Sequence, residues 1–357
     1  MIKIAIGPYS WSGGVKTHIF NLHKASKYQT KIIKYSPFSI WYPRYKLSSF
    51  LLRQQKCSKF DVYTYILKKY ISQNYNILHT HGHPVWRGLY EYFPKTKLKL
   101  IHTVHQVYSR EDELANEKIW KNMNLKNKLM FDYCRSPDVT TVTVSDFVGE
   151  ILFDQGISAE VIPNGVDFQE IETANPDRFR TNYNIKEDFF LFIGHMGFIK
   201  RPDLFIELAN KIPDKKFVMI GPDISEENIL IKYNMKIPEN LIVLGKTPRA
   251  TVLDAMKACK VYIQPSVSET FAITLLESTV CRKPTVSTNS GGIPELKKAG
   301  VPIILSEAND INDLYEKACY AWDHPELGEQ GYQKVKEKYD WNVIIKRIDC
   351  LYERVMQ

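Results

Sequence analysis

The 357-residue sequence lacks most of the features that assign a protein to a class at first sight. No apolar run approaches the roughly 20 residues that a membrane-spanning helix needs. The first seven residues alternate like a short strand and have no signal-peptide layout. The six cysteines form no CxxC pair, which favours reduced thiols over a disulfide framework or a structural zinc site. These absences predict a cytoplasmic protein. Because no helix-turn-helix, RNA-recognition signature or zinc finger is present either, we expect no nucleic-acid partner.

Basic charge is concentrated in the first half of the chain. Residues 1–170 carry 23 lysines and arginines against 14 acidic residues, whereas the remaining residues carry 25 against 26. Many of the cations lie between Lys24 and Lys69, where aromatic residues such as Trp41 and Tyr45 are interleaved with them. Such a stretch is either a solvated helix face with ordinary core aromatics or a surface that contacts an anionic membrane.

Short apolar runs alternate with amphipathic stretches along the whole chain, which is the pattern of β-α-β units in a parallel sheet. We expect two series of six strands: residues 3–7, 30–35, 76–80, 99–104, 139–144 and 159–163, then 189–194, 216–221, 241–245, 260–265, 284–288 and 301–305. With helices on both faces of each sheet, this predicts an α/β fold with two Rossmann-like, doubly wound domains.

The two series are separated by a polar segment, residues 165–188, which contains no convincing strand. We place the domain linker there, so that the expected domains cover residues 1–168 and 169–340. Residues 341–356 read as an amphipathic helix. Because open α/β sheets bind ligands beyond the carboxyl ends of their strands, two such sheets are expected to face each other across a ligand-binding cleft.

The first loop carries a glycine pair, Gly13 and Gly14, between a strand and a helix. Glycines allow close approach of a ligand, and the free N–H groups of a helix N-terminus attract anions. The arrangement fits an anion site or a tight turn equally well. It is not a P-loop, because Lys16 and Thr17 follow the glycines at the wrong spacing.

Two glutamates, Glu269 and Glu277, are separated by seven residues at the start of a predicted helix. Glu269 falls in the loop before the helix, where a carboxylate can accept hydrogen bonds from sugar hydroxyls. Glu277 falls inside the helix, where it could bind the two hydroxyls of a ribose, as acidic residues do in dinucleotide sites. The helix N-terminus would favour a diphosphate. The alternative is a capped surface helix with ordinary glutamates.

Five histidines form a second cluster of chemical interest. His79, His81 and His83 alternate on a predicted strand and would point to one side, and His102 and His105 lie on the next strand. Three histidines on one side could bind zinc, which would indicate a metal-dependent hydrolase. No downstream carboxylate element of such a site is present, and cleft or core histidines without a metal are the simpler interpretation.

Taken together, these motifs resemble the retaining glycosyltransferases of the GT-B fold, in the family called glycosyl transferases group one, or family four. The resemblance extends over nearly the whole chain in the family's order. It rests on Gly13-Gly14, on His105 at a strand end, on Asn164-Gly165-Val166-Asp167, on Glu269 and Glu277, on Ser290-Gly291-Gly292 with Glu295, and on Tyr339-Asp340-Trp341.

The resemblance implies a role for each matched residue. Glu269 would hold the donor sugar, helped by backbone N–H groups around Phe271, Ala272 and Ile273, while Glu277 would hold the ribose. Gly14 would lie near the donor phosphate, and His105 near the transferred sugar. The first domain would bind the acceptor, with the helix 341–357 packing back on it, and the second domain would bind the nucleotide sugar.

One family element departs from its usual form. The element with glycine, arginine and lysine maps to Gly194, His195 and Lys200, so that histidine replaces the arginine. Lys200 would pair with the leaving diphosphate. A permanently charged planar group has become a titratable ring, which leaves open how the second phosphate is neutralised. Arg201, next in the sequence, is a candidate substitute.

The resemblance further implies the reaction and its partners. It predicts transfer of a sugar from a UDP- or GDP-linked donor to a glycan or lipid-linked acceptor, with retention of configuration by front-face displacement. No two aspartates are spaced D-x-D, the metal-binding signature of the other main glycosyltransferase fold, so we expect no metal and no cofactor. Peripheral contact with the inner face of a membrane is an expectation for the basic first domain. The alternatives are the metal-dependent hydrolase and a non-catalytic nucleotide-sugar binder.

Overall fold

The computed structural model describes residues 2–9, 14–34, 69–82, 97–108 and 117–357. Within these residues the chain forms two compact units. The first contains the described residues up to Tyr108, Lys118–Asn164 and Trp341–Gln357, and the second contains Glu117 and Gly165–Asp340. Among the described helices, none is both long and apolar enough to span a bilayer.

The first unit is a six-stranded sheet in which all neighbouring strands are parallel, with the order β2-β1-β3-β4-β5-β6. Its elements are β1 (Lys3–Tyr9), α1 (Gly14–Ala25), β2 (Gln29–Lys34), β3 (Ile77–His81), β4 (Lys99–Val104), α5 (Glu117–Cys134), β5 (Val139–Thr143), α6 (Asp146–Asp154), β6 (Ala159–Val161) and the C-terminal α16 (Trp341–Met356).

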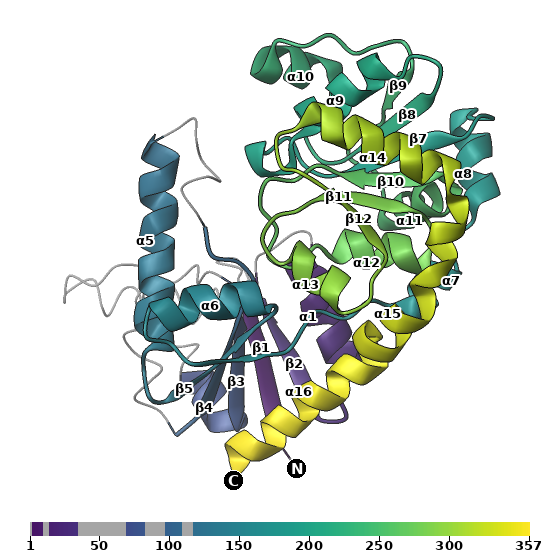
Figure 1. The fold of residues 1–357 in the computed structure, drawn as a ribbon. Coiled ribbons are helices and arrows are strands. Elements are labelled where there is room, and N and C mark those ends of the chain that lie inside the picture. Colours follow the sequence, from purple (N-terminus) through teal and green to yellow (C-terminus); the bar gives the residue numbers. More distant parts are fainter. Residues whose placement is uncertain (1, 10–13, 35–68, 83–96, 109–116) are drawn as a thin grey trace, which may run out of the picture. The chain divides into compact units, whose positions relative to one another are not determined.

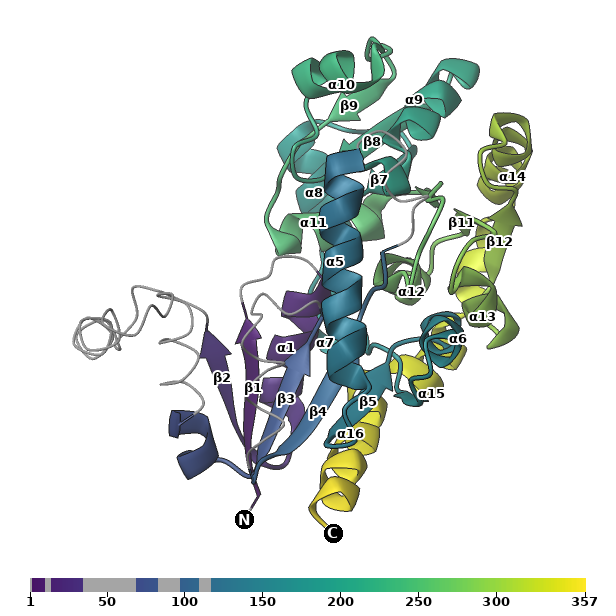
Figure 2. The same ribbon diagram turned by 90° about the vertical axis from the view of Figure 1, so that its left-hand side faces the viewer.

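Helices cover both faces of this sheet because successive side chains along each strand point to opposite sides. Ile4 and Ile6 of β1 pack with Ile19 of α1 and Ile348 of α16 on one face, whereas Ala5 points to the other. Figure 1 shows α16, in yellow, running along the sheet. In Figure 2, α5 stands on the viewer's side of the strands.

The second unit is also a six-stranded parallel sheet, with the order β12-β11-β10-β7-β8-β9. Read from β9, this is the strand order 3-2-1-4-5-6 of dinucleotide-binding domains. Its elements are α7 (Phe168–Glu172), α8 (Pro176–Tyr183), β7 (Phe189–Ile193), η4 (Phe198–Lys200), α9 (Pro202–Lys211), β8 (Lys216–Ile220), α10 (Glu226–Tyr233), β9 (Leu241–Val243), α11 (Arg249–Ala258), β10 (Val261–Gln264), α12 (Ile273–Val280), β11 (Thr285–Thr288), α13 (Ile293–Lys298), β12 (Ile303–Ser306), α14 (Ile311–Asp323), η5 (Pro325–Gln330) and α15 (Tyr332–Tyr339).

The twelve strands expected from the sequence are all present, and the α/β fold of two doubly wound sheets is confirmed. The expected linker differs from what the structure shows. Residues 168–183 fold into α7 and α8, which belong to the second unit. Side-chain caps explain why a polar segment without strands becomes helical: Asp167 caps α7 and Asn175 caps α8.

Candidate active site

Two loops of the second unit lie side by side where its strand order reverses. β7 and β10 are hydrogen-bonded neighbours although two strands of the sequence lie between them. In open α/β sheets, this switch point at the carboxyl ends of the strands is where ligands bind. Residues 194–201 follow β7, and residues 265–272 follow β10. The sheet order therefore brings together the two segments that the sequence singled out.

The backbone of the loop after β7 contacts the backbone of the segment after β8 closely. Gly221, which follows β8, lies so near this loop that a Cβ on it would collide with the carbonyl oxygen of Gly194. The N–H of Gly194 donates to the carbonyl of Ile220 at 3.0 Å. The loop then enters η4, whose last residue is Lys200.

His195 in this loop is a neutral hydrogen-bond donor. Burial, followed by the charge of Lys200, lowers the pKa of His195 below its ordinary value of 6.5. The N–H of Gly197 donates to His195 Nδ1 at 2.8 Å, so the proton of the neutral ring sits on Nε2. An N–H donor without charge thus stands where the family pattern has arginine.

Glu269 is held by a cation and by an amide. Lys200 Nζ donates to Glu269 Oε1 at 2.5 Å, and the Gln264 amide donates to the same oxygen at 2.7 Å. The carbonyl oxygen of the buried Gln264 accepts hydrogen bonds from the hydroxyls of Tyr262 (3.0 Å) and Thr274 (2.5 Å). Because a carboxylate only accepts, this network fixes the orientation of the amide. Within the described chain, no hydrogen bond reaches Glu269 Oε2, which leaves that oxygen as an acceptor for a ligand.

The backbone around Glu269 is fixed by the glycine pair at the start of α13. The N–H of Gly292 donates to the carbonyl of Glu269 at 2.7 Å. Gly291 has φ +54, and a Cβ at this position would collide with the same carbonyl oxygen. Nearby, Ala272 caps α12 in the left-handed region with φ 51, a conformation that costs an L-residue about 1–2 kcal/mol. The loop is therefore strained at the helix N-terminus that follows Phe271.

Glu277 lies inside α12 and is paired with Arg249, the first residue of α11. The two groups form a bidentate ion pair, with Arg249 Nη2 2.5 Å from Oε1 and Nη1 3.1 Å from Oε2. Arg249 also contacts Glu170 of α7 at 3.1 Å. Glu277 is buried and Arg249 is partly exposed. The arginine thus holds both oxygens of Glu277 in a defined direction.

Arg201, the candidate substitute for the missing arginine, forms an ion pair with a neighbouring carboxylate in the structure. Its guanidinium is committed to Asp203, with Nη2 at 2.7 Å and Nε at 2.9 Å from one carboxylate oxygen, and it also contacts Asn309. The pair is largely buried. The reason is local: Arg201 is the residue just before α9 and Asp203 is the second residue of that helix, so the two side chains lie beside each other.

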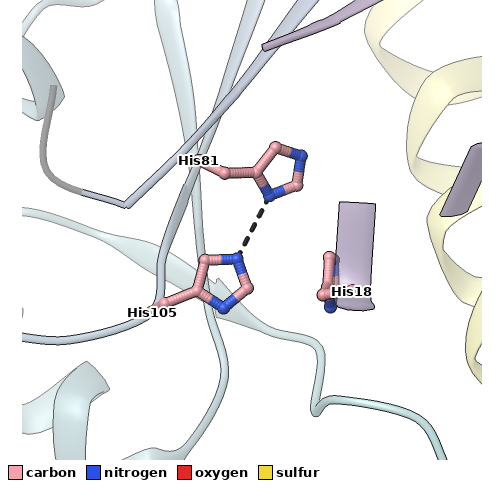
Figure 3. Close-up of side chains that lie close together, drawn as sticks. All are labelled: His18, His81 and His105. Carbon is pink, nitrogen blue, oxygen red and sulfur yellow. Dashed lines mark hydrogen bonds between the residues drawn. The ribbon is translucent and has the colours of Figure 1, made fainter. Parts of the chain in front are cut away.

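The first unit also has a switch point, between β1 and β3. Gly14 begins α1 there, whereas Gly13 lies outside the described residues. His81 ends β3, and His105 follows β4. His81 Nδ1 and His105 Nε2 are 3.1 Å apart, and His18 of α1 lies beside both rings (Figure 3). Burial is the main cause that lowers the pKa of all three histidines.

Among the described residues, the histidines that the fold brings together are His18, His81 and His105, whereas the expected trio was His79, His81 and His83. His83 lies outside the described residues. His79 stacks on His81, but its Nδ1 is bonded to the Tyr352 hydroxyl at 2.7 Å and its Nε2 to the Thr103 hydroxyl at 2.8 Å. Both ring nitrogens are thus engaged in protein hydrogen bonds, so His79 is a core histidine that ties β3 to α16.

Comparison with known proteins identifies the family. The profile of glycosyl transferases group 1 matches residues 174–338, and that of glycosyltransferase family 4 matches residues 12–170. The chain belongs to the group 1 glycosyltransferases. It is therefore a transferase, and its two doubly wound sheets are those of the GT-B fold.

Individual relatives of this glycosyltransferase are distant but span its length. An uncharacterised glycosyltransferase of Methanocaldococcus jannaschii is 27% identical over 97% of this chain and 96% of its own. N-acetyl-alpha-D-glucosaminyl L-malate synthase of Bacillus anthracis is 23% identical over 80% of this chain and 76% of its own. The structure of Anabaena HepE in complex with UDP covers 99% of this chain and 100% of its own, with a TM-score of 0.77 and 14% identity.

Some residues of the candidate site had no clear sequence signal. The glycine pair Gly291-Gly292 was visible as a motif, but its contact with Glu269 was not. Gln264 is a polar residue at the end of an otherwise apolar strand, and this polarity is the only sequence feature that sets it apart. Arg249 lies far from Glu277 in the sequence, and no motif around it predicts their ion pair. His18 likewise lies in a helix whose amphipathic pattern accounts for it as an ordinary residue.

Proposed function

We propose that this glycosyltransferase moves a sugar from a UDP- or GDP-linked donor, with retention of configuration and without a metal. The observation that carries this proposal is the Lys200–Glu269 pair at the switch point of the second unit, at the N-terminus of α12. The carboxylate there suits the hydroxyls of a sugar, and the cation and the free helix N–H groups suit a diphosphate. The UDP in the HepE structure supports a nucleotide-sugar donor.

In this proposal the diphosphate is held by charge and by N–H donors. The ammonium group of Lys200 has three protons, and Glu269 uses one of them. The others can bind the phosphate oxygens, together with the backbone N–H groups of residues 271–273 and the Nε2–H of His195. Such fixed donors stabilise the negative charge that develops on the leaving diphosphate.

Glu277 is proposed to bind the ribose hydroxyls. Its two oxygens offer about four acceptor sites, and the Arg249 pair uses two of them. The remaining sites can accept the 2′ and 3′ hydroxyls of a nucleoside. Arg249 would then keep the carboxylate ionised and correctly directed, which is a positioning role.

The reaction would proceed by front-face displacement, with the leaving phosphate helping to deprotonate the acceptor. Correct positioning then matters more than a general base. Glu269 and His105 are proposed to contact the transferred sugar. The acceptor is proposed to be a glycan or a lipid-linked glycan, bound by the first unit, and the protein to work in the cytoplasm at a membrane surface. The basic stretch behind the membrane proposal lies mostly outside the described residues, and sedimentation with anionic vesicles at low salt tests it.

A thermal-shift screen with UDP, GDP and their sugar conjugates, with and without EDTA, tests the donor proposal. A ligand that binds only the folded state raises its stability by mass action. We expect one nucleotide to raise the unfolding temperature equally with and without EDTA. Glu277→Gln should lose this shift, whereas Glu316→Gln, the same change on the exposed face of α14, should keep it. No shift with any nucleotide would contradict the proposal.

A further inference from the structure

Three buried histidines of the first unit converge on one point. His18, His81 and His105 are 3%, 3% and 7% exposed. Their ring centroids are 4.8 to 5.4 Å apart, and one nitrogen of each ring lies within 4.8 Å of the others. Figure 3 shows the three rings around a common space. They come from α1, from the end of β3 and from the segment after β4, so the switch point of the sheet assembles them.

This geometry resembles that of imidazoles around a metal ion. Two nitrogens bound to one tetrahedral ion at about 2.0–2.1 Å are roughly 3.3 Å apart. The separation of His81 Nδ1 and His105 Nε2 is 3.1 Å. Bringing the third nitrogen to the same spacing needs a side-chain movement on the order of 1–2 Å. The rings are therefore close to a three-histidine site without a change of the backbone.

The protonation state and the hydrogen bonds of the rings favour a cation. Burial keeps all three histidines neutral at pH 7, and a neutral imidazole is the form that binds metals. Nδ1 of His18 donates to Asn164 Oδ1 at 2.9 Å, which leaves the lone pair on Nε2. Within the described part of the chain, Nε2 of His18 is buried without a hydrogen-bond partner. Asn164 thus orients a ligand ring, as outer partners do in metal sites.

We propose that His18, His81 and His105 form a binding site for one borderline transition-metal ion of the Zn²⁺ type. Three imidazole ligands suit Zn²⁺, Co²⁺, Ni²⁺ and Cu²⁺, whereas Mg²⁺ and Ca²⁺ prefer oxygen ligands. Three protein ligands leave a fourth coordination position for water or another small ligand.

The ion is proposed to inhibit the enzyme. This consequence rests on the proposed function, in which His105 contacts the transferred sugar. A metal bound to the ring would remove its nitrogen from that contact, so micromolar Zn²⁺ should slow sugar transfer and EDTA should restore it. The binding of the ion itself does not depend on this role, and the two are measured separately.

Cobalt titration of the full-length protein tests the binding. Co²⁺ is the probe because its visible absorption reports coordination geometry. We expect one Co²⁺ per chain, with the strong bands of a tetrahedral site and without a thiolate charge-transfer band. His18→Ala should weaken this binding about 100-fold or more, and Asn164→Ala about 10- to 100-fold, as loss of an outer partner does elsewhere. His23→Ala removes an exposed imidazole from the same helix and should leave the binding unchanged.

X-ray absorption of the Zn²⁺-loaded wild-type protein keeps the proposal testable if His18→Ala fails to fold. We expect a first shell of nitrogen and oxygen with the outer scattering of about three imidazoles. A shell that contains sulfur would place the ion at a cysteine and would overturn the proposal. The absence of tetrahedral Co²⁺ binding, or binding that a folded His18→Ala keeps, would overturn it as well. Neither result depends on whether the protein transfers sugars.

Discussion

Lowering the pH from 7.5 to 5 should destabilise the first unit, because its buried histidines resist protonation. Burial is the main cause that lowers the pKa of His18 from 6.5 to about 4. The stabilisation from a depressed histidine pKa is complete above the unfolded value of 6.5 and is lost as the pH falls toward the folded value of about 4. At pH 5 the unfolded chain is almost fully protonated at this residue and the folded chain is not. The lowered pKa of His18 alone then reduces the free energy of unfolding by about 2 kcal/mol.

Native-state hydrogen exchange of peptides from β3 and β4, corrected for the intrinsic effect of pH on exchange, measures this loss in the first unit. We expect a loss greater than about 2 kcal/mol in the wild type, since the pKa values of His79, His81 and His105 are lowered as well. In His18→Gln, the loss of stability between pH 7.5 and pH 5 should be smaller than in the wild type by about 2 kcal/mol. In His23→Gln, this loss should equal that of the wild type. The reasoning is refuted if His18→Gln shows the same pH dependence as the wild type.

Three further substitutions have effects that follow from local contacts. Ala272→Gly should stabilise the second unit by about 0.5–1 kcal/mol, because glycine relieves the left-handed strain at a smaller entropic cost; a lower unfolding temperature would contradict this. Gly291→Ala should destabilise the second unit by at least about 1–2 kcal/mol and displace Glu269. Calorimetry would detect the loss of stability, and a nucleotide titration would detect the displacement as weaker binding. Unchanged nucleotide binding would argue against the contact between Gly291 and Glu269. Tyr352→Phe should cost about 1–3 kcal/mol in urea unfolding, because it leaves Nδ1 of His79 buried without its partner; a neutral effect would refute this.

The regular part of the fold could be predicted because its signal is local. Short apolar runs identified all twelve strands, and their alternation with amphipathic stretches implied parallel sheets. The segment after Asn164 was misread as a linker because its helices depend on side-chain caps and not on an apolar stripe. A search for strands and apolar periodicity does not detect that signal.

The partners of the site residues were harder to predict, because tertiary structure chooses them. Strand alternation correctly put His79 and His81 on one side, but His18 reaches His81 from a helix 63 residues earlier. The cation beside Glu277 is Arg249, which belongs to another helix, and no sequence pattern pairs the two residues. Arg201 forms an ion pair with Asp203, a contact that the sequence analysis did not anticipate. The motifs thus located the two loops of the candidate site, whereas the ion pairs within them could be identified only from the structure.

Release of nucleoside diphosphate from a panel of UDP- and GDP-sugars, assayed in EDTA, tests the central claim most directly. The account predicts that the wild-type protein releases UDP or GDP from at least one donor. Lys200→Met should reduce this release by about 100-fold or more, the loss expected when a fixed group that stabilises transition-state charge is removed. Glu316→Gln should leave it unchanged. Release by Lys200→Met at the wild-type rate, or no release from any donor by the folded wild-type protein, would contradict the account.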